Sequence, residues 1–379
     1  MKLLLLYVDA WPFRYKDILV NELDIMDNPG ISRLIPVYGF TDCFKTTLIS
    51  GLYPVNHGYW VSYRFSDKKV NRPLPEFTSS FFDRSSLIAR GSRFILNRFL
   101  HNHLFQVKSW GHIRTGGISS EAPIEKIDRY LRSRGFETLF SLMDKSSISY
   151  TILEDRFYEH SLGRFFKEIQ NKGRGVDVVF GYIDEPDFWG HRYGTEDPRY
   201  LKLIRWLARL LKLFIKMIST MGVSYLIFSD HGMTTVNKFL NVYDMFPGDP
   251  MYGNEYVVGI DATFLRIFYL DREPVKSPVL DRIRKIVYKY GYKLGEEEYS
   301  KYKLPLTRDY GDEVYALKEG AVFFPNFFSW LKPYGMHAYS PDYPSQHGVV
   351  VASNDINIKK ENLDVVELSS IIRRFISAL

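Results

Sequence analysis

Continuous apolar runs, each followed at once by acidic or histidine residues, recur along the chain. Residues 2–8, 176–183 and 223–228 read KLLLLYV, VDVVFGYI and VSYLIF. Runs of this kind are typical of strands in a parallel sheet whose two faces are both covered by helices. Shorter runs predict further strands at residues 31–35, 149–153 and 348–352.

Between these runs, apolar positions recur at the spacing of three and four residues that is typical of helices. Helices are expected at residues 136–145, 161–172 and 278–290, and from Val365 onward. Another begins at Asp197-Pro198, since Asp is a favoured N-cap and Pro a favoured first helical residue, and it runs to about Thr220. The alternation of strands and helices predicts an α/β fold with a doubly wound, mainly parallel central sheet flanked by helices.

Two regions interrupt this alternation, and we interpret them as insertions into one domain that spans residues 1–379. Residues from about 63 to 134 are rich in basic and aromatic side chains and are predicted to form a cap or lid. Residues from about 263 to 334 are predicted to form a small α/β subdomain. Within the first insertion, Leu87–Phe105 has apolar and basic residues at roughly helical spacing. It is either a lid helix packed on the core or a segment at a membrane interface.

The helix that follows Asp197 carries a basic residue at every third or fourth position. These residues are Lys202, Arg205, Arg209, Lys212 and Lys216. The stripe predicts either a solvated outer face or contact with a membrane or a phosphate-rich partner.

Composition narrows the class of protein. The 379 residues are 45% hydrophobic and 25% charged, which is typical of a globular protein with a sizeable core. A net charge of +6 suits an anionic substrate, and no nucleic-acid-binding motif is recognisable. The single cysteine, Cys43, excludes an intramolecular disulfide. The first apolar run is short and ends at Asp9, and no run is long enough to span a bilayer, so we expect a cytoplasmic protein.

Residues able to bind metals or attack an electrophile lie at or just after the predicted strand ends. They are Asp9, Thr41, Asp187, His191, Asp230, His231 and His337. Open α/β sheets bind their ligands at this edge, so one crevice could collect all seven. Carboxylates and imidazoles suit Zn²⁺ and similar ions, and seven groups are enough for two ions. Two such ions can hold a phosphoryl group between them, and a threonine hydroxyl on one ion is a suitable nucleophile.

The motifs VDAW, GFTDCFKTTLISGLYPVNHG, YIDEPDFWGHRYG, FSDHGM and GMHAY occur in this order along nearly the whole chain. The set resembles the alkaline phosphatase superfamily, and within it the nucleotide pyrophosphatase/phosphodiesterase (type I phosphodiesterase) branch. The resemblance implies a doubly wound α/β core with two bound metals, commonly zinc, with Mn²⁺ or Mg²⁺ as alternatives. It also implies a small phosphorylated substrate, such as a nucleotide, a sugar nucleotide or a lipid-linked phosphate.

The resemblance assigns roles to individual residues. Asp9, Thr41, Asp230 and His231 match the ligands of the metal that activates the nucleophile, and Asp187, His191 and His337 match the ligands of the other metal. Thr41 lies ten residues before Gly51, as the family's nucleophile does, so it would carry the covalent phosphoryl group. Backbone N–H groups at Asp42 and Cys43 would help to hold the phosphoryl oxygens. We expect His57 to fix the GLYPVNHG turn, and His347 is a rival to His337.

The sequence also departs from the family pattern. TDCFKTT stands where the family usually has TFPNHYT, and Ser62 falls where the diesterases have an asparagine that binds a phosphoryl oxygen. The leading hypothesis is a phosphodiesterase or pyrophosphatase with a phosphothreonine intermediate. The alternatives are a phosphomonoesterase, phosphonate hydrolase or head-group transferase on the same scaffold, a non-catalytic metal-binding scaffold protein, and a peripheral membrane protein acting on a lipid-linked phosphate.

Overall fold

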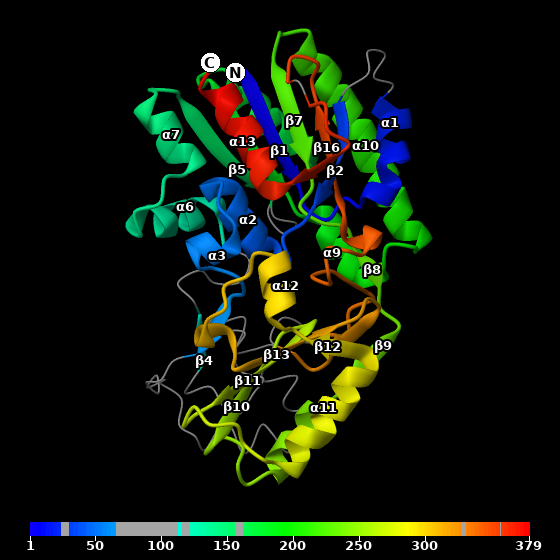
Figure 1. Ribbon diagram of the computed structural model, residues 1–379. Coiled ribbons are helices and arrows are strands. Elements are labelled where there is room, and N and C mark those ends of the chain that lie inside the picture. The colour runs from blue at the N-terminus through cyan, green and yellow to red at the C-terminus, as the bar shows by residue number, and fades with distance from the viewer. Residues whose placement is uncertain (24–29, 66–112, 116–121, 156–161, 327–330, 357) are drawn as a thin grey trace.

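The computed structural model describes residues 1–23, 30–65, 113–115, 122–155, 162–326, 331–356 and 358–379. A seven-stranded sheet forms the larger part of the molecule (Figure 1). Its strands, in spatial order, are β17 (Asn362–Asp364), β2 (Gly30–Ile35), β16 (Gly348–Ala352), β7 (Ser224–Phe228), β1 (Leu3–Val8), β6 (Val178–Ile183) and β5 (Tyr150–Asp155). Only β16 runs antiparallel to its neighbours, β2 and β7, so the sheet is mainly parallel as predicted.

Strand β1 shows why helices cover both faces of this sheet. Its residues alternate between two separate hydrophobic cores, since successive side chains of a strand point to opposite faces. Leu3, Leu5 and Tyr7 belong to one core. That core is completed by α2 (Thr41–Ser50), α6 (Ile124–Ser133), α7 (Leu139–Lys145) and α13 (Val365–Ile376). The other residues of β1 face α1 (Lys16–Leu23), α8 (Leu162–Gly173) and α10 (Pro198–Ser219). This is the predicted doubly wound arrangement.

A smaller antiparallel sheet lies below the main sheet in Figure 1. Its spatial order is β10 (Tyr256–Ile260), β11 (Phe264–Tyr269), β13 (Glu313–Leu317) and β12 (Gly291–Lys293). Helices α11 (Pro278–Tyr290) and α12 (Glu296–Lys301) accompany it. The unit begins at β10, ahead of the predicted boundary near residue 263, because β10 and β11 form one antiparallel pair.

The described ends of the predicted cap belong to two different parts of the molecule. Strands β3 (Tyr63–Phe65) and β4 (Ile113–Thr115) pair antiparallel. Helix α6 packs in the main core, with Ile124, Ile127 and Leu131 fully buried, so the cap cannot extend to residue 134 as predicted. Residues 66–112, which include the Leu87–Phe105 segment, lie outside the described residues.

Short elements complete the described chain. They are α3 (Pro54–His57), α9 (Glu185–Tyr193), β8 (Thr234–Thr235), β9 (Lys238–Leu240), β14 (Ala321–Phe323), β15 (Gly335–Met336) and 3-10 turns at Phe13–Tyr15, Tyr243–Gly248, Arg308–Tyr310 and Pro344–Gln346. Of these, α9, β8 and β15 matter most for the site, because they surround the carboxyl ends of β6 and β7.

Candidate active site

The first cluster of candidate ligands lies at the ends of two adjacent strands. Asp9 follows β1, and Asp230 and His231 follow β7, which pairs with β1 in parallel. One ligand atom from each of the three side chains lies within 4.8 Å of the others. We call Asp9, Asp230 and His231 the inner group, because they are 2%, 0% and 4% exposed.

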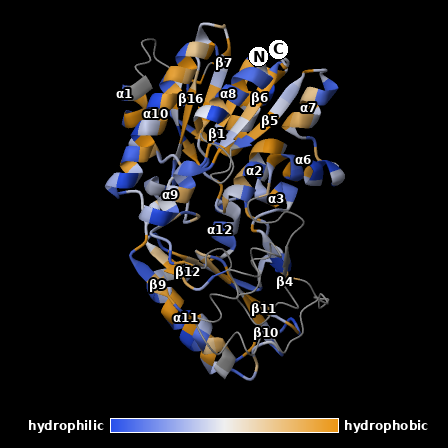
Figure 2. Ribbon diagram, turned by 180° about the vertical axis from the view of Figure 1, so that it is seen from behind, coloured by the Kyte–Doolittle hydropathy of each residue, from blue (hydrophilic) through white to orange (hydrophobic). Residues whose placement is uncertain are grey.

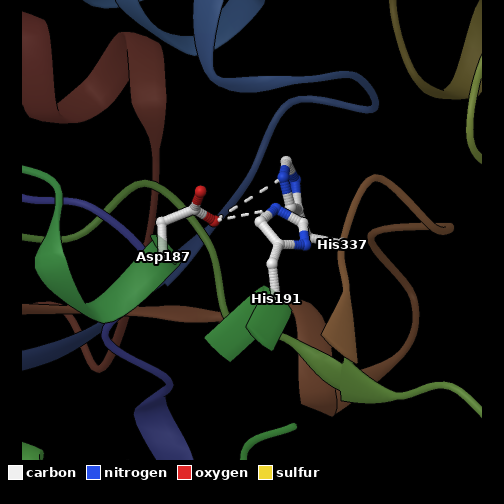
Figure 3. A group of neighbouring side chains, drawn as sticks. All are labelled: Asp187, His191 and His337. Carbon is white, nitrogen blue, oxygen red and sulfur yellow. Dashed lines mark ion pairs between the residues drawn. The ribbon is translucent and has the colours of Figure 1, made fainter. Parts of the chain in front are cut away.

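The second cluster combines a helix with a distant loop (Figure 3). Asp187 and His191 lie one turn apart on α9, and His337 follows β15. Asp187 Oδ1 is 3.3 Å from His191 Nε2 and 3.8 Å from His337 Nε2. We call these three residues the outer group, because Asp187 and His191 keep side-chain exposures of 22% and 29%.

The two groups adjoin through their histidines. The rings of His231 and His337 stack with centroids 3.7 Å apart and planes 10° apart. The six side chains of the two groups therefore lie next to one another, and His337 is the histidine that joins them. The rival residue, His347, is not in either group, and its Nε2 lies 2.8 Å from the Pro341 carbonyl oxygen.

Backbone carbonyl groups fix two of the histidine rings. His191 Nδ1 is 2.8 Å from the Gly335 oxygen, and His231 Nδ1 is 2.8 Å from the Gly232 oxygen. A nitrogen facing a carbonyl oxygen carries a proton, so in both rings Nε2 is the atom turned toward the carboxylates. Gly335 can approach α9 this closely only without a side chain, since a Cβ there would lie 2.4 Å from the Gly190 oxygen.

Hydrogen bonds also fix the two carboxylates of the inner group, each through one of its oxygens. Asp9 Oδ2 accepts a hydrogen bond from the Tyr182 hydroxyl at 2.6 Å, and Asp230 Oδ1 accepts one from the Ala10 N–H at 3.1 Å. Their other oxygens, Asp9 Oδ1 and Asp230 Oδ2, and also Asp187 Oδ1, are buried without a hydrogen-bond donor.

These acceptors fit a pair of cations. Buried carboxylate oxygens without a hydrogen-bond donor are costly unless positive charge lies beside them. Burial, reinforced by the charges of Asp230 and Asp187, raises the pKa of Asp9 well above its usual value. Burial also lowers the pKa of His337, which keeps this imidazole neutral. Carboxylates with neutral imidazoles form the donor set of zinc and related ions.

Thr41 lies where a nucleophile for such a site is needed. It is the first residue of α2, and its N-cap residue, Phe40, makes no side-chain capping bond. Its hydroxyl oxygen is 3.3 Å from His231 Nε2, so it adjoins the inner group. Thr41 is the only residue of α2 that is not buried. The positive end of the helix dipole therefore points at the space beside this hydroxyl.

The hydrogen-bond donors of Cys43 and Ser62, both predicted to contact the substrate, have partners within the protein. The Cys43 N–H donates to the Phe40 carbonyl at 2.8 Å, since this bond closes the first turn. The Cys43 thiol is buried, which raises its pKa, so it is not placed as a nucleophile. The Ser62 hydroxyl donates to Asp42 Oδ2 at 3.2 Å and is itself 1% exposed. Local hydrogen bonds therefore use both donors in this structure, and a substrate contact of either residue stays a prediction.

Asp42 has a structural partner in addition to Ser62. Its Oδ1 accepts the Ala122 N–H at 3.2 Å, which ties the start of α2 to the segment before α6. A carboxylate thus stands beside the nucleophile, at a position where the sequence prediction considered only the backbone N–H.

His57 holds the turn after α2, as predicted. Its Nδ1 accepts the Tyr59 N–H at 3.1 Å, so Nε2 carries the proton and lies 3.1 Å from the Thr47 hydroxyl. Burial, with the nearby charges of Arg64 and Arg134, lowers the pKa of His57 to about 3. The neutral imidazole is therefore part of the fold that supports α2.

Sequence reasoning missed Lys45 and Tyr182. Lys45 is only 2% exposed, and its Nζ lies 3.9 Å from the centroid of the Tyr182 ring. Tyr182 in turn donates to Asp9, and the charge of Lys45 opposes the rise in the pKa of Asp9. The available signal was the position of Lys45 on α2, one helical turn after Thr41, because side chains four residues apart share a face.

Comparison with known proteins identifies the family. Residues 31–263 match the family "type I phosphodiesterase / nucleotide pyrophosphatase". The chain belongs to this family. Human ectonucleotide pyrophosphatase/phosphodiesterase family member 7 is 40% identical over 67 residues, which is 17% of this chain and 15% of that protein.

Solved structures of the same family share the fold. Murine ectonucleotide pyrophosphatase/phosphodiesterase 5 superposes with a TM-score of 0.69 at 17% identity, covering 100% of this chain and 95% of that one. The human protein of the same name gives 0.67 at 14% identity, with the same coverage. An inactive threonine-to-alanine variant of the murine protein, in complex with AMP, gives 0.68 at 17% identity over 100% and 95%. These likenesses confirm the predicted alkaline phosphatase-like architecture.

Proposed function

We propose that this chain is a two-metal phosphodiesterase or nucleotide pyrophosphatase that acts through a phosphothreonine on Thr41. One observation carries the proposal. The inner and outer groups, whose carboxylates have oxygens without a hydrogen-bond donor, meet beside the Thr41 hydroxyl at the start of α2. Membership of the type I phosphodiesterase family supports it.

The inner group, with Thr41, would hold one divalent ion, and the outer group would hold the other. The mixture of imidazole and carboxylate favours Zn²⁺, with Mn²⁺ or Mg²⁺ as alternatives. Two bound ions supply positive charge to the phosphoryl oxygens and lower the pKa of a coordinated hydroxyl.

The protein's own groups define the rest of the reaction. The start of α2 would direct N–H dipoles at the phosphoryl group, and the contact with His231 would keep the Thr41 hydroxyl in position. The Thr41 hydroxyl gives up its proton as its oxygen forms a bond to phosphorus, the bond from phosphorus to the leaving oxygen breaks, and the leaving oxygen takes up one proton. One water then hydrolyses the phosphothreonine and restores the hydroxyl.

The substrate would be a small phosphorylated molecule. A related protein of this fold has been solved with AMP, which supports a nucleotide for this chain as well.

Hydrolysis of bis-p-nitrophenyl phosphate and of a nucleotide diester, with and without a chelator, tests the proposal. We expect activity that chelation removes and that added metal restores. Thr41→Ala should lose at least about a thousandfold in kcat while keeping its metal, whereas Thr41→Ser should keep part of the activity.

Unchanged turnover in Thr41→Ala would reject the phosphothreonine mechanism. A higher rate on p-nitrophenyl phosphate than on the diester would instead indicate a phosphomonoesterase. Purified protein holding far less than one metal ion per chain, even after addition of zinc, would favour a non-catalytic scaffold.

A further inference from the structure

Helix α10 is strongly cationic. Its sequence, PRYLKLIRWLARLLKLFIKMIS, holds six lysines and arginines and no acidic residue. The chain has 50 basic and 44 acidic residues in total, so these six cations equal its entire net charge of +6. One of them, Arg199, pairs with Asp197 at 2.8 Å, and the others follow further along the helix.

The inner face of α10 is an ordinary core face. Tyr200, Ile204, Leu207, Leu211 and Phe214 are buried against the main sheet and α8. This packing fixes which side of the helix is turned outward, and Figure 2 shows blue and orange residues alternating along α10 at the edge of the molecule.

Large apolar side chains lie on the outer face as well. Trp206 is 46% exposed and Leu213 is 67% exposed. Lys202, Trp206, Arg209, Leu213 and Lys216 follow one another at intervals of four and three residues, so cations and apolar groups alternate along one exposed stripe. Lys202, Arg205 and Lys216 are exposed and make no ion pair with an acidic side chain of the described residues.

We propose that this outer face of α10, the α10 stripe, docks the protein on an anionic lipid surface. Among the described residues no helix is long and apolar enough to cross a membrane, so α10 would lie along the surface. Cations suit the lipid phosphates, while Trp206 and Leu213 would enter the boundary between headgroups and acyl chains. This inference is independent of the proposed catalytic function.

Two other occupants fit the same face less well. A second copy of the chain would place one acid-free cationic helix against another, and like charges repel. A nucleic acid would use the cations but would leave Leu213 without a partner, since its backbone offers phosphates rather than apolar surface. The combination of cations with aliphatic and indole side chains therefore favours lipid.

Co-sedimentation with vesicles tests the docking. The full chain should bind vesicles of phosphatidylcholine with phosphatidylserine, and only weakly vesicles of phosphatidylcholine alone. Lys202→Glu/Lys216→Glu should weaken binding to the anionic vesicles by about tenfold or more, because each basic residue contributes to attraction at the surface. Leu213→Ser should also weaken it, by about threefold to tenfold, with the net charge unchanged.

Helix α11 provides a matched control. Lys285 and Lys289 flank the exposed Tyr288, so Lys285→Glu/Lys289→Glu makes the same change in charge on another helix. Unaltered circular dichroism and unaltered hydrolysis of a soluble diester would show that all variants fold.

Three outcomes would overturn the proposal. The first is no binding of the unmodified protein to anionic vesicles at low salt. The second is an equal loss for the α10 and α11 variants, which would mean that only net charge matters. The third is normal binding by Leu213→Ser, which would mean that the stripe does not enter the lipid and meets an acidic or nucleic-acid partner instead.

Discussion

The inner and outer groups are made of similar side chains but are held in different ways. The inner group comes from the ends of two adjacent parallel strands, and its carboxylates are fixed by Tyr182 and the Ala10 N–H. The outer group joins two residues of α9 to His337, and it relies on the contact of His191 with the Gly335 carbonyl.

Burial adds to this difference. Asp9 and Asp230 are 2% and 0% exposed, whereas the side chains of Asp187 and His191 are 22% and 29% exposed. A site whose ligands are locked by buried neighbours is preorganised, and a site that keeps contact with water loses its ion more readily. We therefore expect the inner group to keep its ion beside Thr41, and we expect the occupancy of the outer group to depend on the metal concentration.

The largest effect should separate the two groups directly. Asp230→Asn removes a charge from the inner group while keeping the Ala10 contact, and it should lower kcat/KM by about a thousandfold or more. Asp187→Asn should lower it by about a hundredfold, with part of the activity restored by excess zinc. Steady-state kinetics at rising zinc concentration measures both.

Metal analysis of the same two variants provides the control. Each should keep roughly one ion per chain, the one in the unmutated group. If excess zinc restored the activity of Asp230→Asn but not that of Asp187→Asn, the inner group would be the adjustable one, contrary to the proposal.

Replacing Lys45 should have a moderate effect on catalysis, because Lys45 supports the inner group but does not belong to it. Lys45→Met removes the cation over the Tyr182 ring, so Asp9 loses its indirect support and kcat/KM should fall by about tenfold. Stability should rise instead, because a buried ammonium group contacts an aromatic ring rather than a carboxylate. Kinetics and the Tm measure the two changes.

Lys285→Met on the exposed face of α11 should change neither quantity. A Lys45→Met variant that loses activity only because its Tm falls would show that Lys45 has a purely structural role.

The smallest effect concerns the turn that supports α2. His57→Gln should lower the free energy of unfolding near neutral pH by about 1–3 kcal/mol, because it disturbs the bonds to Tyr59 and Thr47. The folded pKa of about 3 lies below the ordinary value of 6.5, so the unfolded state binds more protons between them. The stabilisation that comes from burying a neutral His57 is therefore complete above pH 6.5 and is lost as the pH falls toward about 3.

The difference in the free energy of unfolding between the unmodified protein and His57→Gln should therefore shrink on acidification, by at most about 1.4 kcal/mol per pH unit. Urea unfolding at neutral pH and near pH about 5 measures it. A difference that stays constant would mean that the buried imidazole does not titrate as the fold requires.

Much of the fold could be predicted because strand and helix signals are local. The runs at residues 2–8 and 223–228 correspond to β1 and β7, and α11 has the predicted bounds of 278–290. Helix α6 was missed because its apolar positions lie in a segment rich in basic residues. Strand β17 was missed because three residues carry too little pattern to identify a strand. The cytoplasmic location stays a prediction.

The candidate site was predictable in its residue types but not in its supports. Each of the seven residues could be picked out by its position after a strand or in a motif, although Asp9 and His337 lie outside the part of the chain that matches the family. Their role as ligands stays a prediction. Lys45, Tyr182 and the pairing of Ser62 with Asp42 could not be predicted, because they depend on which side chains meet across the core.

The sequence by itself determined which residues stand at strand ends, because the alternation of apolar runs with polar residues is a property of neighbouring positions. Only the tertiary structure decided that Asp9 meets His231 and that Asp187 meets His337. It also decided which donors remain available, since the hydroxyl of Ser62 and the N–H of Cys43 are used within the fold. Three carboxylate oxygens of the inner and outer groups, in contrast, are left without a donor. Pairing and satisfaction of buried polar groups arise from packing between distant segments, and local sequence patterns do not encode them.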